Sequence, residues 1–162
     1  MRRAACLALT IPMLMALPAL AQTVAFGGMK ADTSAPVELA AESLTVNQTT
    51  GKAEFNGNVL IGQGQMKLSA DKVVVEYVQG DTQKIDNLDA TGNVTLVNGP
   101  DAAEARQAIY DVASGNITLI GDVLLTQGQN VLSGERMVVN LSDGTAQMDG
   151  RVRSVLQPAG KQ

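Results

Sequence analysis

The stretch Thr91–Gly99, TGNVTLVNG, decides the fold because the chain contains the same nine-residue pattern three times. The other copies are NGNVLIGQG at Asn56–Gly64 and IGDVLLTQG at Ile120–Gly128. Each copy has a glycine followed by a polar residue, then alternating apolar residues, then a second glycine. A pattern that recurs at regular spacing indicates an internal repeat, in which one structural unit is stacked several times.

A second landmark extends the pattern to a unit of 29 residues. A small residue, a charged residue and an apolar run recur as AESLTVN from Ala41, ADKVVVEY from Ala70, ARQAIYDV from Ala105 and GERMVVNL from Gly134. The spacings are 29, 35 and 29 residues. The longer spacing reflects one six-residue insertion between Gly80 and Gly92. We expect this insertion to form a longer hairpin that projects from one edge.

The secondary structure predicted for the repeat is β-strand throughout. Apolar residues alternate with polar ones, as at Val73, Val75 and Tyr77, and β-branched residues are frequent. Turn sequences such as NQTTG, ASG and SDG separate the runs. No stretch after the N-terminal segment keeps the 3.6-residue period of a helix. The protein is therefore predicted to be all-β.

Each leg between two turns is longer than a typical strand and has a small residue near its middle. These small residues are Gly57, Gly92, Gly121 and Gly150 in one set and Ala41, Ala70, Ala105 and Gly134 in the other. A small residue there suits a bulge or sharp bend, at which a strand passes from one sheet to a second. We therefore expect two facing antiparallel sheets built from about 16 short strands, four in each repeat.

Stacking the units aligns equivalent apolar side chains into ladders on the inward face. We expect the following residues to line that interior: Leu44, Val46, Phe55, Val59, Ile61, Val73, Val75, Leu88, Val94, Leu96, Tyr110, Ile117, Leu119, Val123, Leu125, Met137, Val139, Met148 and Val152. A dry, close-packed core is the commoner arrangement of such ladders. The chain has only two Phe, two Tyr and no Trp, however, and slim aliphatic side chains favour a slot that suits alkyl chains.

The N-terminal segment has the features of a cleavable signal peptide over residues 1–21. Arg2 and Arg3 are followed by an apolar run, and Ala19-Leu20-Ala21 forms a cleavage-type motif before Gln22. We expect a soluble, exported protein with a flexible segment at 22–35, one β-domain at 36–156 and a short tail at 157–162. The single cysteine, Cys6, lies in the leader, so no disulfide is expected in the mature chain.

Composition argues against several classes of function. The net charge of −4 makes nucleic acid a poor partner. Without histidine, and without cysteine after the leader, the usual general bases, nucleophiles and thiolate metal sites are missing. Charged residues recur at one repeat position, as Glu42, Asp71, Arg106 and Glu135, which is typical of the solvent face of a strand. We expect no catalytic site, no metal and no cofactor.

The repeated GNV units, followed by ADK or GER and a second alternating run, resemble the OstA-like family over about residues 36–156. The resemblance implies a twisted, open β-jellyroll in the periplasm that carries the lipid A acyl chains of lipopolysaccharide in an apolar groove. It also implies head-to-tail homo-oligomers and two partners, an inner-membrane LptC-type protein and an outer-membrane LptD-type protein.

Open sheet ends are suited to strand addition, so we expect docking edges at residues 36–46 and 147–156.

The alternative to a lipid-carrying protein is an adhesin-like structural repeat protein that shares the ladders but has a sealed core and no affinity for lipid.

Overall fold

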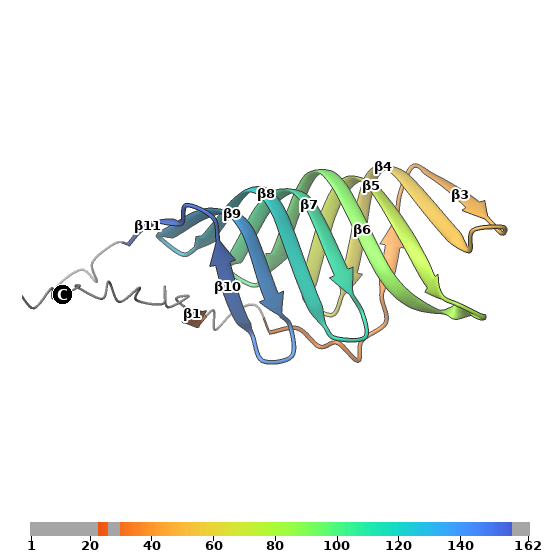
Figure 1. The fold of residues 1–162 in the computed structure, drawn as a ribbon, viewed down its shortest axis with the longest axis horizontal. Helices are drawn as coiled ribbons and strands as arrows, with labels where there is room; N and C mark the ends of the chain where they lie inside the picture. The colour runs from red at the N-terminus through yellow and green to blue at the C-terminus, as the bar shows by residue number, and fades with distance from the viewer. Residues whose placement is uncertain (1–22, 26–29, 157–162) are drawn as a thin grey trace, which may run out of the picture.

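The computed structural model describes residues 23–25 and 30–156, and this part of the chain consists of β-strands, turns and loops (Figure 1). The strands are β1 (Thr23–Ala25), β2 (Glu38–Ala40), β3 (Ser43–Asn47), β4 (Lys52–Gln63), β5 (Met66–Val78), β6 (Asp81–Asn98), β7 (Asp101–Asp111), β8 (Asn116–Gln127), β9 (Asn130–Asn140), β10 (Thr145–Asp149) and β11 (Arg153–Val155). Within these residues, no helix has the length and apolar character needed to cross a membrane. The expected leader at 1–21 and tail at 157–162 lie outside the described residues.

The strands form one continuous antiparallel array in the order β1-β10-β9-β8-β7-β6-β5-β4-β2, with β3 also on β4 and β11 also on β9. Strands β4 to β10 each pair with the strand that follows or precedes them in the chain, so each repeat adds one hairpin to the stack. This antiparallel, helix-free arrangement of the described residues confirms the predicted fold class.

The described residues contain eleven strands rather than about sixteen, because each leg from β4 to β9 passes through its bend as one continuous strand, whereas the first and last legs are divided into β2 and β3 and into β10 and β11. The register shifts between Asn56 and Val59 on β4, and equivalent shifts occur on β6 and β8. At the first of these bulges Gly57 has a φ of +82° and Asn58 a φ of +45°. Glycine adopts this backbone conformation without steric cost, and asparagine tolerates it better than most residues, which explains the recurring Gly-Asn pair.

The bends lie along one side of the molecule and the hairpin turns lie along the other (Figure 1). The turns fall into two rows. The first row is formed by residues 47–52, 78–81, 111–116 and 140–145, and the second by residues 63–66, 98–101 and 127–130. Each strand from β4 to β9 therefore runs from one row through a bend to the other row. The two halves of these strands form two facing arms that are joined at the bends.

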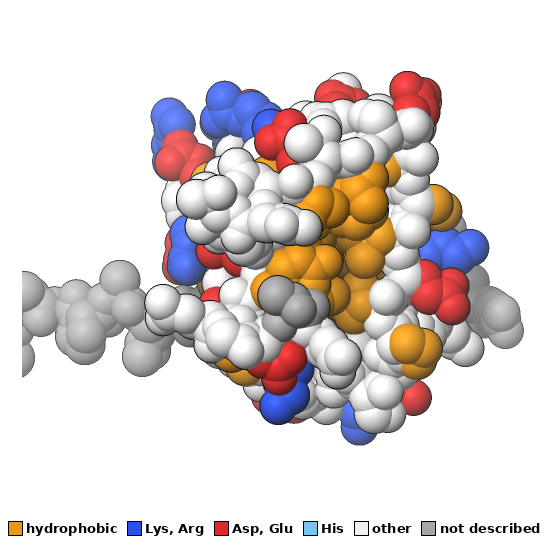
Figure 2. All heavy atoms as spheres, turned by 90° about the vertical axis from the view of Figure 1, so that its right-hand side faces the viewer, with side chains coloured by type: hydrophobic (Ala, Val, Ile, Leu, Met, Phe, Trp, Pro, Cys, Tyr) orange, Lys and Arg blue, Asp and Glu red, His pale blue; other side chains and the backbone are white. Residues whose placement is uncertain are grey.

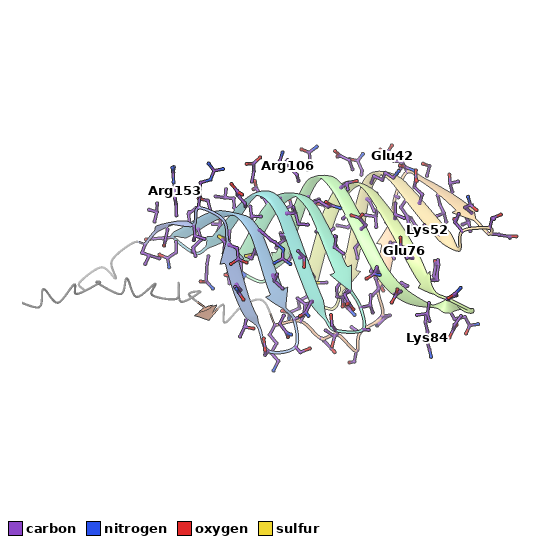
Figure 3. All side chains as sticks on the ribbon, in the orientation of Figure 1. Glu42, Lys52, Glu76, Lys84, Arg106 and Arg153 are labelled. Carbon is purple, nitrogen blue, oxygen red and sulfur yellow. The ribbon has the colours of Figure 1, made fainter. Side chains whose placement is uncertain are left out.

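The recurring charged residues lie exposed above the bends, where Figure 3 shows Glu42 and Arg106. Each pairs with the residue after the next bend glycine. The Asn58 amide donates to Glu42, and the Asn93 amide donates to Asp71 at 2.8 Å. Arg106 pairs with Asp122 at 3.3 Å, and Arg151 pairs with Glu135. The repeated charge therefore belongs to a solvent-facing structural motif, as expected from the sequence.

The six-residue insertion lengthens the hairpin of β5 and β6. Asn87 on β6 is paired with Asp111, the last residue of β7, so the part of β6 before Asn87 extends past the neighbouring turn. The Val112 amide donates to the Asp86 carbonyl at 3.1 Å beside this extension. Lys84 projects from it in Figure 3. The insertion thus extends the first row of turns without disturbing the ladders that follow.

Candidate functional site: the apolar interior and its open end

The interior is built from ladders of apolar side chains that cross the whole array. On the arm next to the first row of turns, paired residues form two ladders. The first ladder is Val46, Ala53, Val75, Leu88, Tyr110, Ile117, Val139 and Ala146, and the second is Leu44, Phe55, Val73, Ala90, Ala108, Leu119, Met137 and Met148. Because directly paired residues point to the same face of a sheet, all these side chains face the space between the arms.

The arm next to the second row of turns supplies a third ladder. Its members are Leu39, Ile61, Leu68, Leu96, Ala103, Leu125 and Leu132. Val59, Val94 and Val123 lie closer to the bends and are opposite Ala70, Ala105 and Gly134. Large side chains thus face small ones beside the bend, where the two arms converge.

The structure buries fifteen of the nineteen side chains that we expected in the interior. They are Val59, Ile61, Val73, Val75, Leu88, Val94, Leu96, Tyr110, Ile117, Leu119, Val123, Leu125, Met137, Val139 and Met148. Phe55 is half-buried, and Leu44, Val46 and Val152 are exposed. The exposed residues fall into two groups, one at each end of the stack.

At the β3 end, Leu44 and Val46 face the interior and are nevertheless exposed to 54% and 60%. They are opposite Phe55 and Ala53, so their orientation is inward. They are exposed because β3 pairs with β4 on one side and the described residues place no strand on its other side. Figure 2, which views this end, shows hydrophobic side chains gathered in a hollow. The ladders therefore continue to an open end.

At the opposite end, Val152 follows the bend glycine Gly150 by two residues, as Val59, Val94 and Val123 follow theirs. It lies between β10 and β11, outside any strand, and is half exposed. The pairing of β11 with β9 begins only at Arg153. Because Arg153 is opposite Ser133, this register places Val152 opposite Gly134, the residue that Val123 faces from β8. Val152 therefore keeps its predicted position at the end of the inner row, and it is exposed because β11 pairs only with β9 among the described strands. Val155 and Leu156 are also exposed here, so this end also presents apolar side chains.

A polar contact joins the two arms on the side of the turns. The Tyr110 hydroxyl, next to the first row, donates to Gln63 Oε1, next to the second row, at 2.7 Å. Both side chains are buried, and burial raises the pKa of the Tyr110 phenol. We call this contact the arm tie. It satisfies two polar groups that would otherwise be costly inside an apolar space.

Sequence reasoning missed two sets of interior residues. Leu68, Ala103 and Leu132 are buried in the third ladder, and the alternation in QMKLSA was a signal for them. Gln63 and Asn98 are buried polar residues at inward positions just before the second-row glycines. Gln127 occupies the equivalent position, so an amide recurs where the alternation calls for an apolar residue. That recurrence was the available signal.

The side chains that line this site are mainly apolar. In the described ranges there is no group of three or more His, Cys, Asp or Glu side chains that could hold a metal ion. A surface hollow of about 490 Å³ lies beside the outer strand β2, lined by residues that include Pro36, Leu39, Leu60 and Lys67. The described interior is thus lined by apolar side chains, and the end strands β3 and β11 each pair on one side only.

Comparison with known proteins places this architecture in a family. The family described as LptA/(LptD N-terminal domain) LPS transport protein matches residues 38–145. An uncharacterised protein of Rhizobium meliloti is 30% identical over 91% of this chain and 86% of its own length. The lipopolysaccharide export system protein LptA of Escherichia coli K12 is 26% identical over 93% of this chain and 86% of its own.

A solved structure has the same fold. It is that of LptH, the LptA-homologous periplasmic component of the lipopolysaccharide transport device of Pseudomonas aeruginosa. It is 20% identical in sequence and superposes with a TM-score of 0.70, covering 79% of this chain and 99% of its own. With its repeated bends, inward ladders and matching family region, this chain belongs to the LptA/LptD N-terminal family of LPS transport proteins.

Proposed function

We propose that this chain is a periplasmic carrier that takes the lipid A acyl chains of lipopolysaccharide into its apolar interior. The observation that carries the proposal is the continuity of the ladders. The same inward-facing positions are sealed at the centre, at Leu119, and exposed at the β3 end, at Leu44 and Val46. An exposed apolar row continuous with a protein's interior is typical of a binding surface rather than of a closed core.

The energetics suit a carrier without catalytic groups. Burying one methylene is worth about 0.8 kcal/mol, so moving an acyl chain of about twelve carbons from an apolar environment into water costs roughly 10 kcal/mol. An apolar path of constant composition keeps each step of movement close to neutral. Transport then needs an energy source upstream and no reacting group in the carrier. This matches the relatives, which are named for lipopolysaccharide export and transport.

We further propose that the chain stacks head to tail through its open sheet ends. At the N-terminal end, β2 and β3 pair only with β4 among the described strands. At the other end, β11 pairs only with β9, whereas β1 covers Thr145–Gln147 of β10. Unpaired strand edges accept added strands. Stacked copies would join an LptC-type protein at the inner membrane to an LptD-type protein at the outer membrane.

One observation favours the alternative of a sealed structural repeat. Side chains in the middle of the ladders, such as Leu96, Ile117 and Leu119, have no exposed area at all. A protein with that core throughout would bind no lipid. The two candidates differ in whether the interior admits a chain, so the test must report contact inside the stack.

The experiment is site-specific photo-crosslinking in cells that make lipopolysaccharide. We would replace Phe55, an inward-facing and half-buried aromatic residue near the open end, with p-benzoylphenylalanine. Glu54 is its outward-facing neighbour on β4 and serves as the matched control. Lipopolysaccharide adducts at position 55 and none at 54 are expected. Adducts at neither position, in a variant that folds and is exported, would favour the sealed repeat.

A further inference from the structure

The open side between the two rows of turns is crossed by residues 30–37, which we call the strap. In Figure 1 this segment runs beneath the stack on its way to β2. Ala31 and Val37 pack against the buried core. The strap therefore lies where the two arms are farthest from their bends, over the side on which the interior would otherwise face solvent.

Side-chain amides of the second row of turns hold the strap by its backbone. Gln63 Nε2 lies 3.2 Å from the Thr33 carbonyl oxygen and 3.0 Å from the Ala35 carbonyl oxygen. The Asn98 amide donates to the Lys30 carbonyl at 3.0 Å. Gln63 and Asn98 are only 2% and 3% exposed, so both amides are directed into the protein and not into solvent. They occupy equivalent positions of successive repeats.

The first row of turns holds the other side of the strap. The Ala31 amide donates to the Leu141 carbonyl at 3.0 Å. Thr33 Cγ2 and Ser142 Oγ lie 3.5 and 3.2 Å from the point where a Cβ on Gly115 would stand, so both side chains lie beside the same turn of the first row. The strap thus bridges both rows.

The contacts of the strap are of a kind that can be exchanged for water. Asp32, Thr33, Ser34 and Pro36 are exposed, and the partly buried residues of the strap are two alanines and a valine. Little apolar surface therefore holds it down. A backbone carbonyl or an amide side chain released from such a contact can bond to water instead, at small net cost.

Directly beneath the strap, Gln63 also takes part in the arm tie. Its Nε2 donates to the strap while its Oε1 accepts from Tyr110 of the opposite arm. One side chain therefore fastens the strap and joins the arms. At the far side the arms are joined by the bends, where pairs such as Gly57 and Asn58 have positive φ and interrupt the ladder.

We propose that the strap and the arm tie form a latch on the open side of the interior, and that an acyl chain enters sideways, between the two rows of turns, when the latch is released. The proposal rests on the lipid-carrying function proposed above. Release of Gln63 frees the strap and separates the arms at once. The interior, filled by its own side chains when latched, then gains width for an apolar chain.

The test locks the strap in place. No cysteine follows Cys6, so Thr33→Cys with Ser142→Cys introduces a unique thiol pair in the mature chain at two exposed positions. Oxidation, or a short bismaleimide, fixes the strap to the first row of turns. Binding of fluorescent lipid A to the full mature chain is measured before locking, after locking and after reduction of the disulfide. The two single-cysteine variants are the controls.

The locked protein is expected to bind lipid A about tenfold more weakly or worse, because the open state is removed from the equilibrium, and reduction should restore binding. Equal binding by the locked and reduced forms would overturn the strap proposal and leave lipid carriage standing. Absence of binding by every form, the single-cysteine controls included, would overturn lipid carriage and the strap proposal together.

A second variant pair tests the latch from the opposite direction. Asn98→Ala removes one bond to the strap, and Gln127→Ala removes the equivalent amide, which bonds Asp101 at 3.1 Å. Lipid A should associate about fivefold faster with the first variant, as expected for one lost hydrogen bond. Amide exchange in the strap should accelerate in parallel. Equal rates in the Asn98→Ala and Gln127→Ala variants would contradict the latch.

Discussion

The centre and the β3 end of the stack contain the same ladder in two different environments. In the second ladder, Leu119 has no exposed area, whereas Leu44, which faces the same way, is 54% exposed. The residue type is identical and the orientation is the same. What differs is the number of neighbouring strands, because Leu119 lies on β8 between β7 and β9 and Leu44 lies on β3 beside β4 alone.

The comparison shows that an inward side chain in a repeat stack is buried when a neighbouring strand covers it on each side, whatever its residue type. The end strand β3 keeps the inward apolar pattern of the centre, but no described strand of this chain covers its outer edge. Natural sheets commonly blunt such edges with charge, proline or twist. Here the inward positions of β3 stay apolar, which favours a partner strand rather than a protected edge.

The sharpest way to test this contrast is to make one substitution at both places. Leu119→Ala should lower the free energy of unfolding by about 2–5 kcal/mol, because it leaves a cavity in a packed centre. Leu44→Ala should change it by about 0.5 kcal/mol or less, because the side chain is already half in water. Urea unfolding followed by circular dichroism measures both. Similar losses for the two variants would mean that the β3 end is covered in solution.

A second prediction concerns the bends that join the arms. Gly121 has a φ of +84°, and a Cβ there would lie 2.5 Å from Arg106 Nε. Gly121→Ala should therefore cost about 1–3 kcal/mol of folding free energy, by backbone strain and displacement of Arg106. Gly62 lies on β4 with an ordinary φ, and a Cβ there would meet no atom within 4 Å, so Gly62→Ala is the matched control.

Thermal unfolding of the two glycine variants gives the comparison. A melting temperature that falls for Gly121→Ala and stays constant or rises for Gly62→Ala is expected. If both variants behave alike, the repeated glycine at the bend is not a requirement of the backbone, and the sealed centre does not depend on that geometry.

The sequence was sufficient for the ladders because strand alternation fixes which way a side chain points. The inward orientation of Val75, Leu88 and Ile117 follows from period and spacing alone, and the structure places all three in the first ladder, with Tyr110 between Leu88 and Ile117. The bends were also predictable, since a small residue recurs in the middle of legs that are too long for single strands. Both features follow from local rules that each repeat obeys separately.

The exposure of the end strand and the position of residues 30–35 could not be predicted, because they depend on contacts between distant parts of the chain. Val46 and Val139 share a ladder and an inward orientation, yet only Val139 is buried, because an end position is not visible in a local pattern. The segment at 22–35 was expected to be a flexible lead-in from its composition, whereas residues 30–35 are held by Gln63, Asn98 and Leu141. The longest of these hydrogen bonds joins Ala31 and Leu141, which are 110 residues apart in the chain. Contacts at such separations leave no periodic pattern in the sequence.

A third prediction uses the open end itself. Val46→Asp places a charge on the inward face of β3, whereas Thr45→Asp places one on the outward face of the same strand. If copies stack through this end, Val46→Asp should weaken self-association about tenfold, because a buried unpaired charge is costly, and Thr45→Asp should have little effect. Sedimentation velocity over a range of concentrations measures this. Equal association by both variants would place the contact between copies elsewhere.

The smallest expected effect lies at the arm tie. Tyr110→Phe removes the bond to Gln63 and should cost about 0.5–1.5 kcal/mol at pH 8. Burial raises the pKa of Tyr110 above its ordinary value of 10.0, so the fold prefers the protonated phenol. Its contribution is therefore fully present below pH 10 and is lost as the pH rises through the raised pKa. Urea midpoints at pH 8 and pH 11 should show the wild type losing more stability than Tyr110→Phe. A difference between the two proteins that stays constant with pH would mean that the phenol ionises without leaving the tie, and the arms would then be joined mainly by apolar packing.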